Sequence, residues 1–250
     1  MARRSSYYYK YEYFPHFSQP TVGELRANAQ KTLQDAGQKG RVYNPVHPKG
    51  NSRSICVTWW GQSWCQNMER YSDYSNRLPR GRYYVNSGTI LDLQILNGEV
   101  QALVQGSRST PYRITIRIDP LSPASEAAIL EKCNRKLRNV EDLIYGRFPD
   151  DLKELFLARG GLFPSPSEIH MSCSCPDWAV MCKHVAATMY GIGVRLDDNP
   201  FFFFTLRGIN VDDFVSRMLA DKVDSMLSHA DVRTDRMIPE EDISELFGVL

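Results

Sequence analysis

The chain has 250 residues and a mass of 28.6 kDa, which leaves room for one large domain or two small ones. Hydrophobic residues make up 42% and charged residues 24% of the composition, as in a folded globular protein rather than a disordered one. No apolar run approaches the ~18 residues of a membrane-spanning helix, and the arginine-bearing N-terminus lacks the apolar core of a secretory signal. We therefore expect a cytoplasmic protein with no membrane partner.

The net charge of +1 hides an uneven distribution along the chain. Residues 1–117 hold 16 Lys and Arg against 7 Asp and Glu, a balance of +9. The balance is −2 over residues 118–194 (8 against 10) and −6 over residues 195–250 (6 against 12). A basic front and an acidic tail indicate surfaces that meet different partners, although charges scattered over solvated faces would give similar counts.

The front of the chain predicts an arm, a helix and a basic loop. The first twenty residues are rich in tyrosine and proline, and we interpret them as an arm. Thr21 followed by Glu24 is a capping box, so a helix is expected over residues 22–36, ending at Gly37. Residues 37–53 carry four basic and no acidic residues among Gly, Pro and Asn, which indicates a basic loop.

A compact block of mixed helices and strands is expected next. Ile114, Ile116 and Ile118 alternate with polar residues, which predicts a sheet with one buried face. Asn97-Gly98 favours a type I′ hairpin turn between two strands. The expected elements are a short strand at 54–60, a helix at 64–74, an arginine-bearing loop at 75–88 and strands at 89–96, 100–106 and 112–118.

Helices dominate the remainder of the chain. Apolar residues at helical spacing predict helices at 123–145 and 211–229, and Pro149 marks the start of a further helix at 149–158. Glycines and prolines between residues 160 and 166 indicate a domain boundary, and a cysteine-rich module follows at 167–193.

Three of the six cysteines fall within ten residues. Cys173, Cys175 and Cys182 precede His184 in the spacing C-x-C-x6-C-x-H. Three thiolates and an imidazole are the ligands of a closed, tetrahedral structural zinc site, and without a secretory signal disulfides are the less expected use of such a cluster. We therefore expect one structural zinc ion on these residues, with no open coordination position to activate water.

The spacing also predicts how the ligands are presented. Side chains two apart point the same way on a strand, so an extended segment at 168–175 lets Cys173 and Cys175 bind one ion. On a helix, residues two apart diverge by about 200°. Cys182 is therefore expected just before a helix that ends at Gly191, with His184 in the first turn. The helix N-terminus and Lys183 should offset the thiolate charge.

At this point the sequence resembles the SWIM-type zinc fingers. The ligand spacing and the pieces Cys-Pro-Asp-Trp and Cys-Lys-His carry the resemblance over residues 167–193. The segments WWGQSWCQNMERYSDYSNRLPRGRYYV and LVQGSRSTPYRITI also resemble bacterial SWIM zinc-finger proteins, which extends it to about residues 55–195. The resemblance implies a role beside Swi/Snf-type helicase-like ATPases, with a finger that binds DNA or a protein partner.

The other cysteines and aromatic residues are expected mainly in the core. Those without a metal-ligand pattern, set among apolar residues, are Cys56, Cys65 and Cys133, and with them Trp59, Trp60 and Trp64. His170 could compete as a ligand but is expected to face solvent. Trp178, between Cys175 and Cys182, is expected either to pack on the metal site or to contact a molecule that the protein binds.

Basic residues and tyrosines interleave in the front half of the chain. Arginine forks suit phosphate oxygens and tyrosine rings stack on bases, so the mixture predicts a nucleic-acid surface, although solvated arginines would have the same pattern. The candidate contacts are Arg70, Arg77, Arg80, Arg82, Arg108 and Lys183.

The chain has no P-loop, H-E-x-x-H or G-x-S-x-G motif. Asp150, Asp151 and Lys153 resemble a nuclease grouping, but acids at a helix start are also expected from the helix dipole. The leading expectation is a non-enzymatic zinc-binding subunit that contacts DNA or another nucleic acid and works with a helicase-like ATPase. The alternatives are a protein-interaction module without nucleic-acid binding and a nuclease.

The expected fold class is α+β, with a small antiparallel sheet and helices, then a strand-knuckle-helix zinc module and a helical tail. The expected ranges are an N-terminal arm, helix and basic loop at 1–53, an α+β domain at 54–165, a zinc finger at 166–195 and an acidic helical tail at 196–250.

Overall fold

Four antiparallel strands in the order β1-β2-β3-β4 form the sheet around which the chain folds. The computed structural model describes residues 20–50, 54–70, 76–136, 153, 157–158 and 160–230. The strands are β1 (Ile90–Leu96), β2 (Glu99–Val104), β3 (Tyr112–Ile118) and β4 (Ile169–Cys173). The helices are α1 (Val22–Gln38), α2 (Trp59–Glu69), α3 (Leu78–Asn86), α4 (Pro123–Lys136), the 3-10 turn η3 (Pro166–Glu168), α7 (Lys183–Asp198), α8 (Phe202–Leu206) and α9 (Val211–Ala230). The α+β class predicted from the sequence is confirmed.

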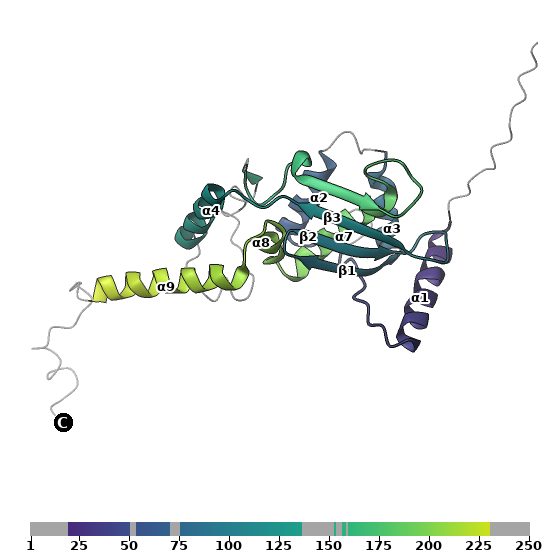
Figure 1. Cartoon of the computed structure of the whole chain (residues 1–250), viewed down its shortest axis with the longest axis horizontal. Helices are drawn as coiled ribbons and strands as arrows, with labels where there is room; N and C mark the ends of the chain where they lie inside the picture. The colour runs from purple at the N-terminus through teal and green to yellow at the C-terminus, as the bar shows by residue number, and fades with distance from the viewer. Residues whose placement is uncertain are drawn as a thin grey trace, which may run out of the picture.

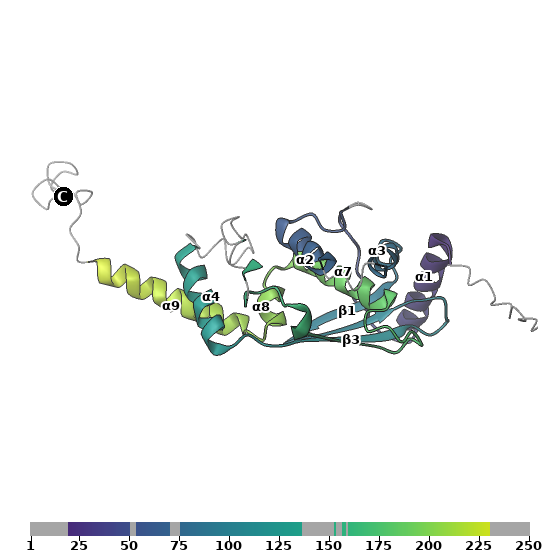
Figure 2. The same cartoon turned by 90° about the horizontal axis from the view of Figure 1, so that it is seen from above.

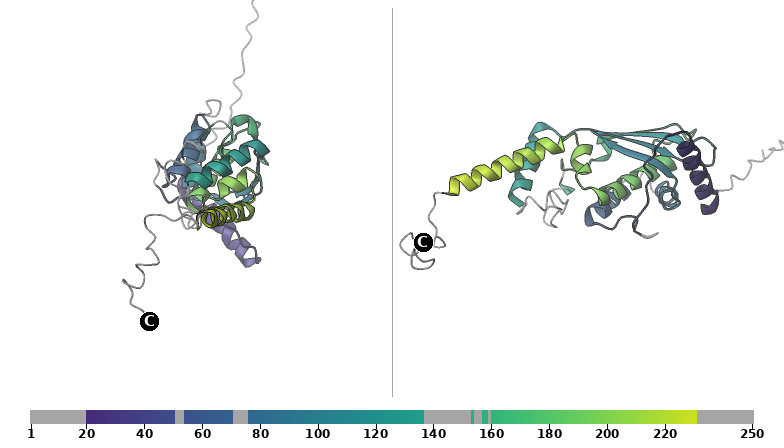
Figure 3. Two further views of the ribbon diagram at one scale, coloured as in Figure 1. Left: turned by 90° about the vertical axis from the view of Figure 1, so that its left-hand side faces the viewer. Right: turned by 90° about the horizontal axis from the view of Figure 1, so that it is seen from below.

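One face of the sheet carries the helices. Helix α7 packs along that face and is covered in turn by α2 and α3, as Figures 1 and 2 show. The predicted alternation in β3 is confirmed, since Ile114, Ile116 and Ile118 are buried while Arg113 and Arg117 are exposed. Helices α4 and α9 extend from one end of the sheet and α1 stands at the other, beside α3 (Figures 1 and 3).

The cysteine-rich module shares this core with the preceding segment. Strand β4 pairs with β3 in a register that places Cys173 opposite Ile114. Residues on either side of the expected boundary, such as Leu162 and Val185, belong to one cluster of buried hydrophobic side chains. The ranges 54–165 and 166–195 are therefore joined by a common sheet and core.

The predicted hairpin is present, but its predicted turn type is wrong. Strands β1 and β2 pair with Leu96 opposite Glu99, which leaves Asn97 and Gly98 as the turn. A type I′ turn needs a positive φ at both residues, whereas only Gly98 has one, at 68°. The turn contacts helix α8, because the Gly98 N–H donates a hydrogen bond to the Thr205 carbonyl at 2.9 Å.

The strand predicted at residues 54–60 is also wrong. Helix α2 begins at Trp59, and the Thr58 side chain caps it by accepting from the Gly61 N–H at 3.1 Å. The backbone N–H groups of Val57 and Thr58 donate to the Asp197 carboxylate at 2.7 and 3.1 Å. The backbone of residues 57–58 therefore hydrogen-bonds to a side chain near the end of α7 and not to a neighbouring strand.

Residues 75–88 are not the predicted loop, because most of them form α3. Leu78, Gly81 and Val85 recur at helical spacing and are buried against α7. A Cβ at Gly81 would lie 2.5 Å from the Cβ of Ala186, so this glycine allows the two helices to approach closely. Arg80 and Arg82 are consequently held on this short helix, and Arg77 is its N-cap residue.

The remaining helices follow the predictions more closely. Helix α1 has the predicted capping box between Thr21 and Glu24, and α9 spans almost the range expected for it. Helix α7 does not end at Gly191 as predicted, since a Cβ there would lie 2.7 Å from Ile90 Cδ1 and the glycine serves packing on β1. Most of the arm, most of the helix predicted at 149–158 and the far ends of the helices predicted at 64–74 and 123–145 lie outside the described residues.

Candidate metal centre

Four ligand side chains converge where β4 leads into α7. Cys173 is the last residue of β4 and Cys175 follows two residues later. Cys182 is the N-cap residue of α7 and His184 lies in its first turn, as the sequence predicted. A strand end, a loop and a helix start therefore bring together ligands that are eleven positions apart.

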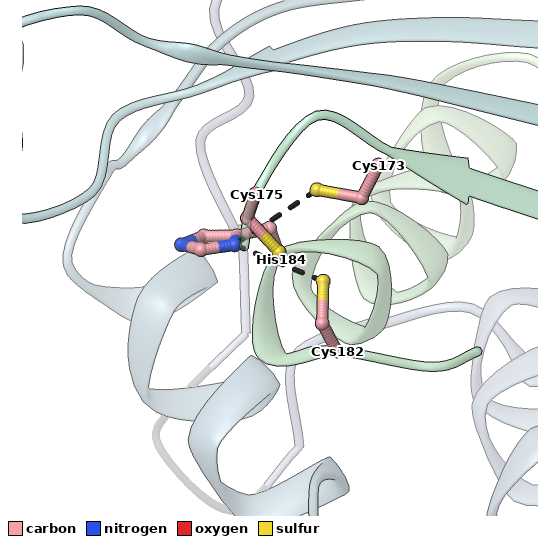
Figure 4. Close-up of side chains that lie close together, drawn as sticks. All are labelled: Cys173, Cys175, Cys182 and His184. Carbon is pink, nitrogen blue, oxygen red and sulfur yellow. Dashed lines mark hydrogen bonds between the residues drawn. The ribbon is translucent and has the colours of Figure 1, made fainter. Parts of the chain in front are cut away.

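The four candidate ligand atoms lie close to one another, although not all at the separations of a tetrahedral ion. The His184 Nδ1 atom lies 3.7 Å from the Cys182 sulfur and 4.0 Å from the Cys173 sulfur, and the four ligand atoms all lie within 4.8 Å of one another (Figure 4). Bonds of about 2.0–2.3 Å to a tetrahedral ion would separate ligand atoms by about 3.3–3.8 Å. Together these four side chains lie close enough to bind a metal ion.

Aromatic neighbours fix the imidazole of His184. The ring lies between Tyr112, at a centroid distance of 4.3 Å, and Tyr84, at 5.4 Å. Gly106 closes the far side, since a Cβ there would lie 3.1 Å from His184 Nε2. His184 is 4% exposed, so its Nδ1 is oriented toward the three sulfurs by packing rather than by solvent.

The electrostatics of the cluster favour a thiolate at the start of α7. Hydrogen bonding from Cys173, helped by His184, lowers the pKa of Cys182 to about 4 against the opposing effect of burial. The hydrogen bond with Cys182 and burial raise the pKa of Cys173, and burial raises that of Cys175. A cation among these sulfurs would relieve the cost of carrying further negative charge.

Asp177 anchors the loop between Cys175 and Cys182, which we call the metal loop. Its carboxylate accepts from the Ala179 N–H at 3.2 Å and forms an ion pair with Arg77 of α3 at 3.1 Å. Sequence reasoning missed this anchor, because nothing in the sequence pairs two residues one hundred positions apart. The same loop exposes Trp178, whose side chain is 92% accessible, so it does not pack on the site.

The predicted nucleic-acid contacts divide into two groups. Three are held by neighbours in the fold: Arg77 by Asp177, Arg82 by Glu69 and the Tyr190 ring, and Lys183 by the Tyr84 ring. The others, Arg70, Arg80 and Arg108, are exposed.

Three segments that contact the metal centre bring most of these cations to one region. They are residues 76–89 with α3, residues 105–113 with the β2–β3 connection, and residues 170–184. Tyr84 of the first segment and Gly106 of the second lie against His184. The second segment ends at Arg113 of β3, whose backbone N–H donates to the Ser174 hydroxyl of the third segment at 3.0 Å. We call the cations of these segments the basic rim: Arg77, Arg80, Arg82, Arg108, Arg113 and Lys183. Asp177 is the only acid in these three segments.

Arg113 was not singled out as a contact residue in the sequence. Its place on the exposed face of β3 was predicted by alternation, but the pairing of β3 with β4 puts it beside the metal loop. Arg70, at the C-cap of α2, lies outside the basic rim segments.

Other residues singled out in the sequence take structural positions. His170 is exposed and contacts Asp119 at 2.9 Å, outside the ligand cluster. Cys56, Cys65, Cys133 and Trp64 are buried in the core, as predicted, and Trp59 and Trp60 are partly buried against it. Asp150 and Asp151, the nuclease-like acids, lie outside the described residues. Every helix of the described ranges lacks the length and apolar character that crossing a bilayer demands.

Comparison with known proteins finds a similar bacterial protein. The uncharacterized protein Rv2102 of Mycobacterium tuberculosis (strain ATCC 25618 / H37Rv) is 36% identical over 192 residues, which cover 76% of this chain and 69% of that protein. No family model matches the chain, and no solved structure matches it. The SWIM resemblance accordingly stays a prediction.

Proposed function

This chain belongs to the same family as the uncharacterized protein Rv2102, and we propose that it is a non-enzymatic, zinc-binding subunit that contacts nucleic acid. The observation that carries the proposal is the basic rim: the three segments that contact the ligand cluster hold six cations, of which Arg77 pairs with Asp177 and Arg82 with Glu69, which leaves four without an acid partner among these ion pairs. Clustered arginine and lysine bind phosphate oxygens and account for much of nucleic-acid affinity.

Zinc is the metal that we propose for the four ligands. Thiolate and imidazole donors favour zinc over hard cations such as magnesium, and a Cys3His set fills all four tetrahedral positions with protein atoms. When bound, the ion would tie β4, the metal loop and α7 together and leave no position for a reacting water. Its proposed role is structural, in agreement with the SWIM resemblance.

The direct test is nucleic-acid binding measured over a salt series. The exposed rim residues Arg80, Arg108 and Arg113 are the best ones to replace, since Arg77 and Arg82 also hold folded contacts. We expect the Arg80→Ala/Arg108→Ala/Arg113→Ala variant to bind labelled DNA weakly, with a slope of log affinity on log salt reduced by about 2–3.

A matched control removes the same charge elsewhere. Lys132, Lys153 and Arg217 are exposed cations outside the basic rim, and their triple alanine variant should bind like the wild type. Absence of salt-sensitive binding by the wild-type protein to either DNA or RNA would overturn the proposal.

A second candidate function, a protein adaptor, is favoured by helix α9. Phe214 anchors its first turn by stacking on Phe204 at 4.7 Å. Farther along, an apolar row with side chains 40–72% exposed shares one face of the helix: Leu219, Val223, Met226 and Leu227. The SWIM resemblance makes a helicase-like ATPase the partner that we propose for this row.

A charge placed in the apolar row tests the adaptor function. We expect Val223→Asp to abolish co-purification of a helicase-like ATPase with the full-length chain while DNA binding is unchanged. Ser228→Asp, on another face of α9, adds the same charge and should leave co-purification intact. An ATPase retained equally by both variants would count against this surface.

A further inference from the structure

Trp178 is the one tryptophan of the four that the fold leaves in solvent. Trp64 is 2% exposed and Trp59 and Trp60 pack against the core, whereas the Trp178 side chain is 92% exposed. Burying an indole is worth several times more than burying a small side chain. A fully displayed indole is therefore a feature that calls for a partner outside the chain.

The metal loop holds this indole in a defined position. Trp178 stands between the ligands Cys175 and Cys182, and its neighbour Asp177 is fixed by Arg77 and by the Ala179 N–H. Met181, at the other end of the loop, is 1% exposed and anchored in the core. A side chain mounted on such a loop loses little conformational freedom when it binds.

Two segments that bond with the metal loop or its flank carry exposed arginines. Arg77, which contacts Asp177, is followed three positions later by the exposed Arg80 on the same side of α3. On the sheet side, the backbone of the exposed Arg113 is bonded to Ser174, which precedes Cys175. An exposed indole on a loop that bonds with arginine-bearing segments suits a ligand that alternates flat rings with negative charges.

We propose that Trp178 stacks on a base of single-stranded nucleic acid while arginines of the basic rim contact the adjoining phosphates. This rests on the proposed function and narrows it to one kind of ligand. The faces of bases in a duplex are covered by their neighbours, so an indole that protrudes from the surface can stack only where a base is unstacked. The excess of cations favours a polyanion over an apolar pocket on a protein.

The test compares Trp178→Ala and Trp178→Phe with the wild-type, zinc-loaded protein. The probes are a fluorescein-labelled oligothymidylate of about 16 nucleotides and a labelled duplex of equal length. We expect Trp178→Ala to weaken single-strand binding about 5- to 150-fold and Trp178→Phe to restore most of it. The salt slope should stay unchanged, since stacking releases no counterions, and duplex binding should change little.

Intrinsic fluorescence supplies a second reading. Oligothymidylate should quench the tryptophan emission of the wild-type protein, and this quenching should be lost in Trp178→Phe, whose three remaining tryptophans are packed against or within the core. Because Trp178 is exposed, both variants should keep the zinc content and melting temperature of the wild type.

The outcomes separate this inference from the function on which it rests. Full single-strand affinity in Trp178→Ala, together with lost affinity in the Arg80/Arg108/Arg113 variant, would refute the stacking role and leave nucleic-acid binding in place. Equal weakening of duplex and single-strand binding by Trp178→Ala would also refute it. A wild-type protein that binds neither probe at low salt would refute both proposals and direct attention to a protein partner for the indole.

Discussion

Arg77 at the start of α3 and Asp177 in the metal loop form an ion pair with an N–O distance of 3.1 Å. The residues are one hundred positions apart, and each is about one quarter exposed. Because Asp177 also accepts from the Ala179 N–H, one carboxylate orders the loop internally and ties it to a helix. The basic segment and the cysteine-rich segment, which the sequence presents as separate features, thus form one surface.

This ion pair should control how firmly the loop holds the metal. Arg77→Ala and Asp177→Asn each remove the pair, and because both partners are partly exposed we expect a loss of only about 0.5–1 kcal/mol in unfolding free energy. Zinc should still bind but should be lost to a chelator faster than from the wild type. Chelator kinetics measured on both variants and on the double variant would test this, and additive effects in the double variant would show that the pair has no such role.

Loss of a metal ligand should act locally. Cys182→Ser removes one thiolate, so we expect loss of bound zinc and new protease sensitivity within residues 167–193, with the β1–β2–β3 sheet intact. The structure places the sensitive sites in the loop between Cys173 and Cys182, because β4 and α7 are held by the core. Zinc content and limited proteolysis with mass spectrometry measure both effects.

Histidine variants give the matched control for the ligand set. His184→Ala should lose zinc as Cys182→Ser does, whereas His170→Ala, at an exposed position outside the cluster, should keep it. Stoichiometric zinc in His184→Ala would contradict the assignment.

The ligand set could be predicted because its information is local. Cys173, Cys175, Cys182 and His184 lie within twelve residues, and strand and helix periodicities alone decide which of them can share an ion. The capping box of α1 and the strand alternation of β3 are local in the same sense. Each was found from residues that are neighbours in the chain.

The predictions that the structure contradicts concern segments whose conformation depends on residues far away in the chain. The backbone of residues 57–58 bonds with Asp197, about 140 positions away, and the turn at Gly98 docks on Thr205. Helix α3 was missed because Gly81 resembles a loop residue until its packing on Ala186 is known. The membership of Arg113 in the basic rim likewise depends on the pairing of β3 with β4, which no short-range pattern encodes.

The close approach of α3 and α7 should not tolerate a larger residue. A Cβ at position 81 would lie 2.7 Å from the carbonyl carbon of Ala186 and 2.8 Å from the backbone nitrogen of Ala187, so no side chain can rotate away to make room. We expect Gly81→Ala to lower the unfolding free energy by about 1–3 kcal/mol and, by displacing α3, to weaken zinc retention. Gly37→Ala in α1, where no atom lies within 4 Å, is the control and should be neutral or slightly stabilising in the same denaturation assay.

The ion pair between Glu168 and Arg207 should make the free energy of unfolding depend on pH. The Arg207 side chain is 1% exposed, donates to Glu168 at 2.6 Å and to the Asp119 carbonyl at 2.9 Å, and joins the start of β4 to the segment after α8. Partial burial tends to raise the pKa of Glu168, but hydrogen bonds from Arg207 and Ser165 outweigh it and lower the pKa below the ordinary value of 4.5.

A carboxyl group with a lowered pKa in the folded state stabilises the fold fully above its ordinary pKa, and this contribution is lost as the pH falls through the lowered value. Glu168→Gln should therefore cost about 1–3 kcal/mol at pH 7, since it leaves a buried guanidinium without its counter-charge. The difference from the wild type should shrink as the pH falls below about 4.5. Urea denaturation of both proteins between neutral and mildly acidic pH measures this difference, and a gap that stays constant or widens on acidification would show that Glu168 is not the group responsible.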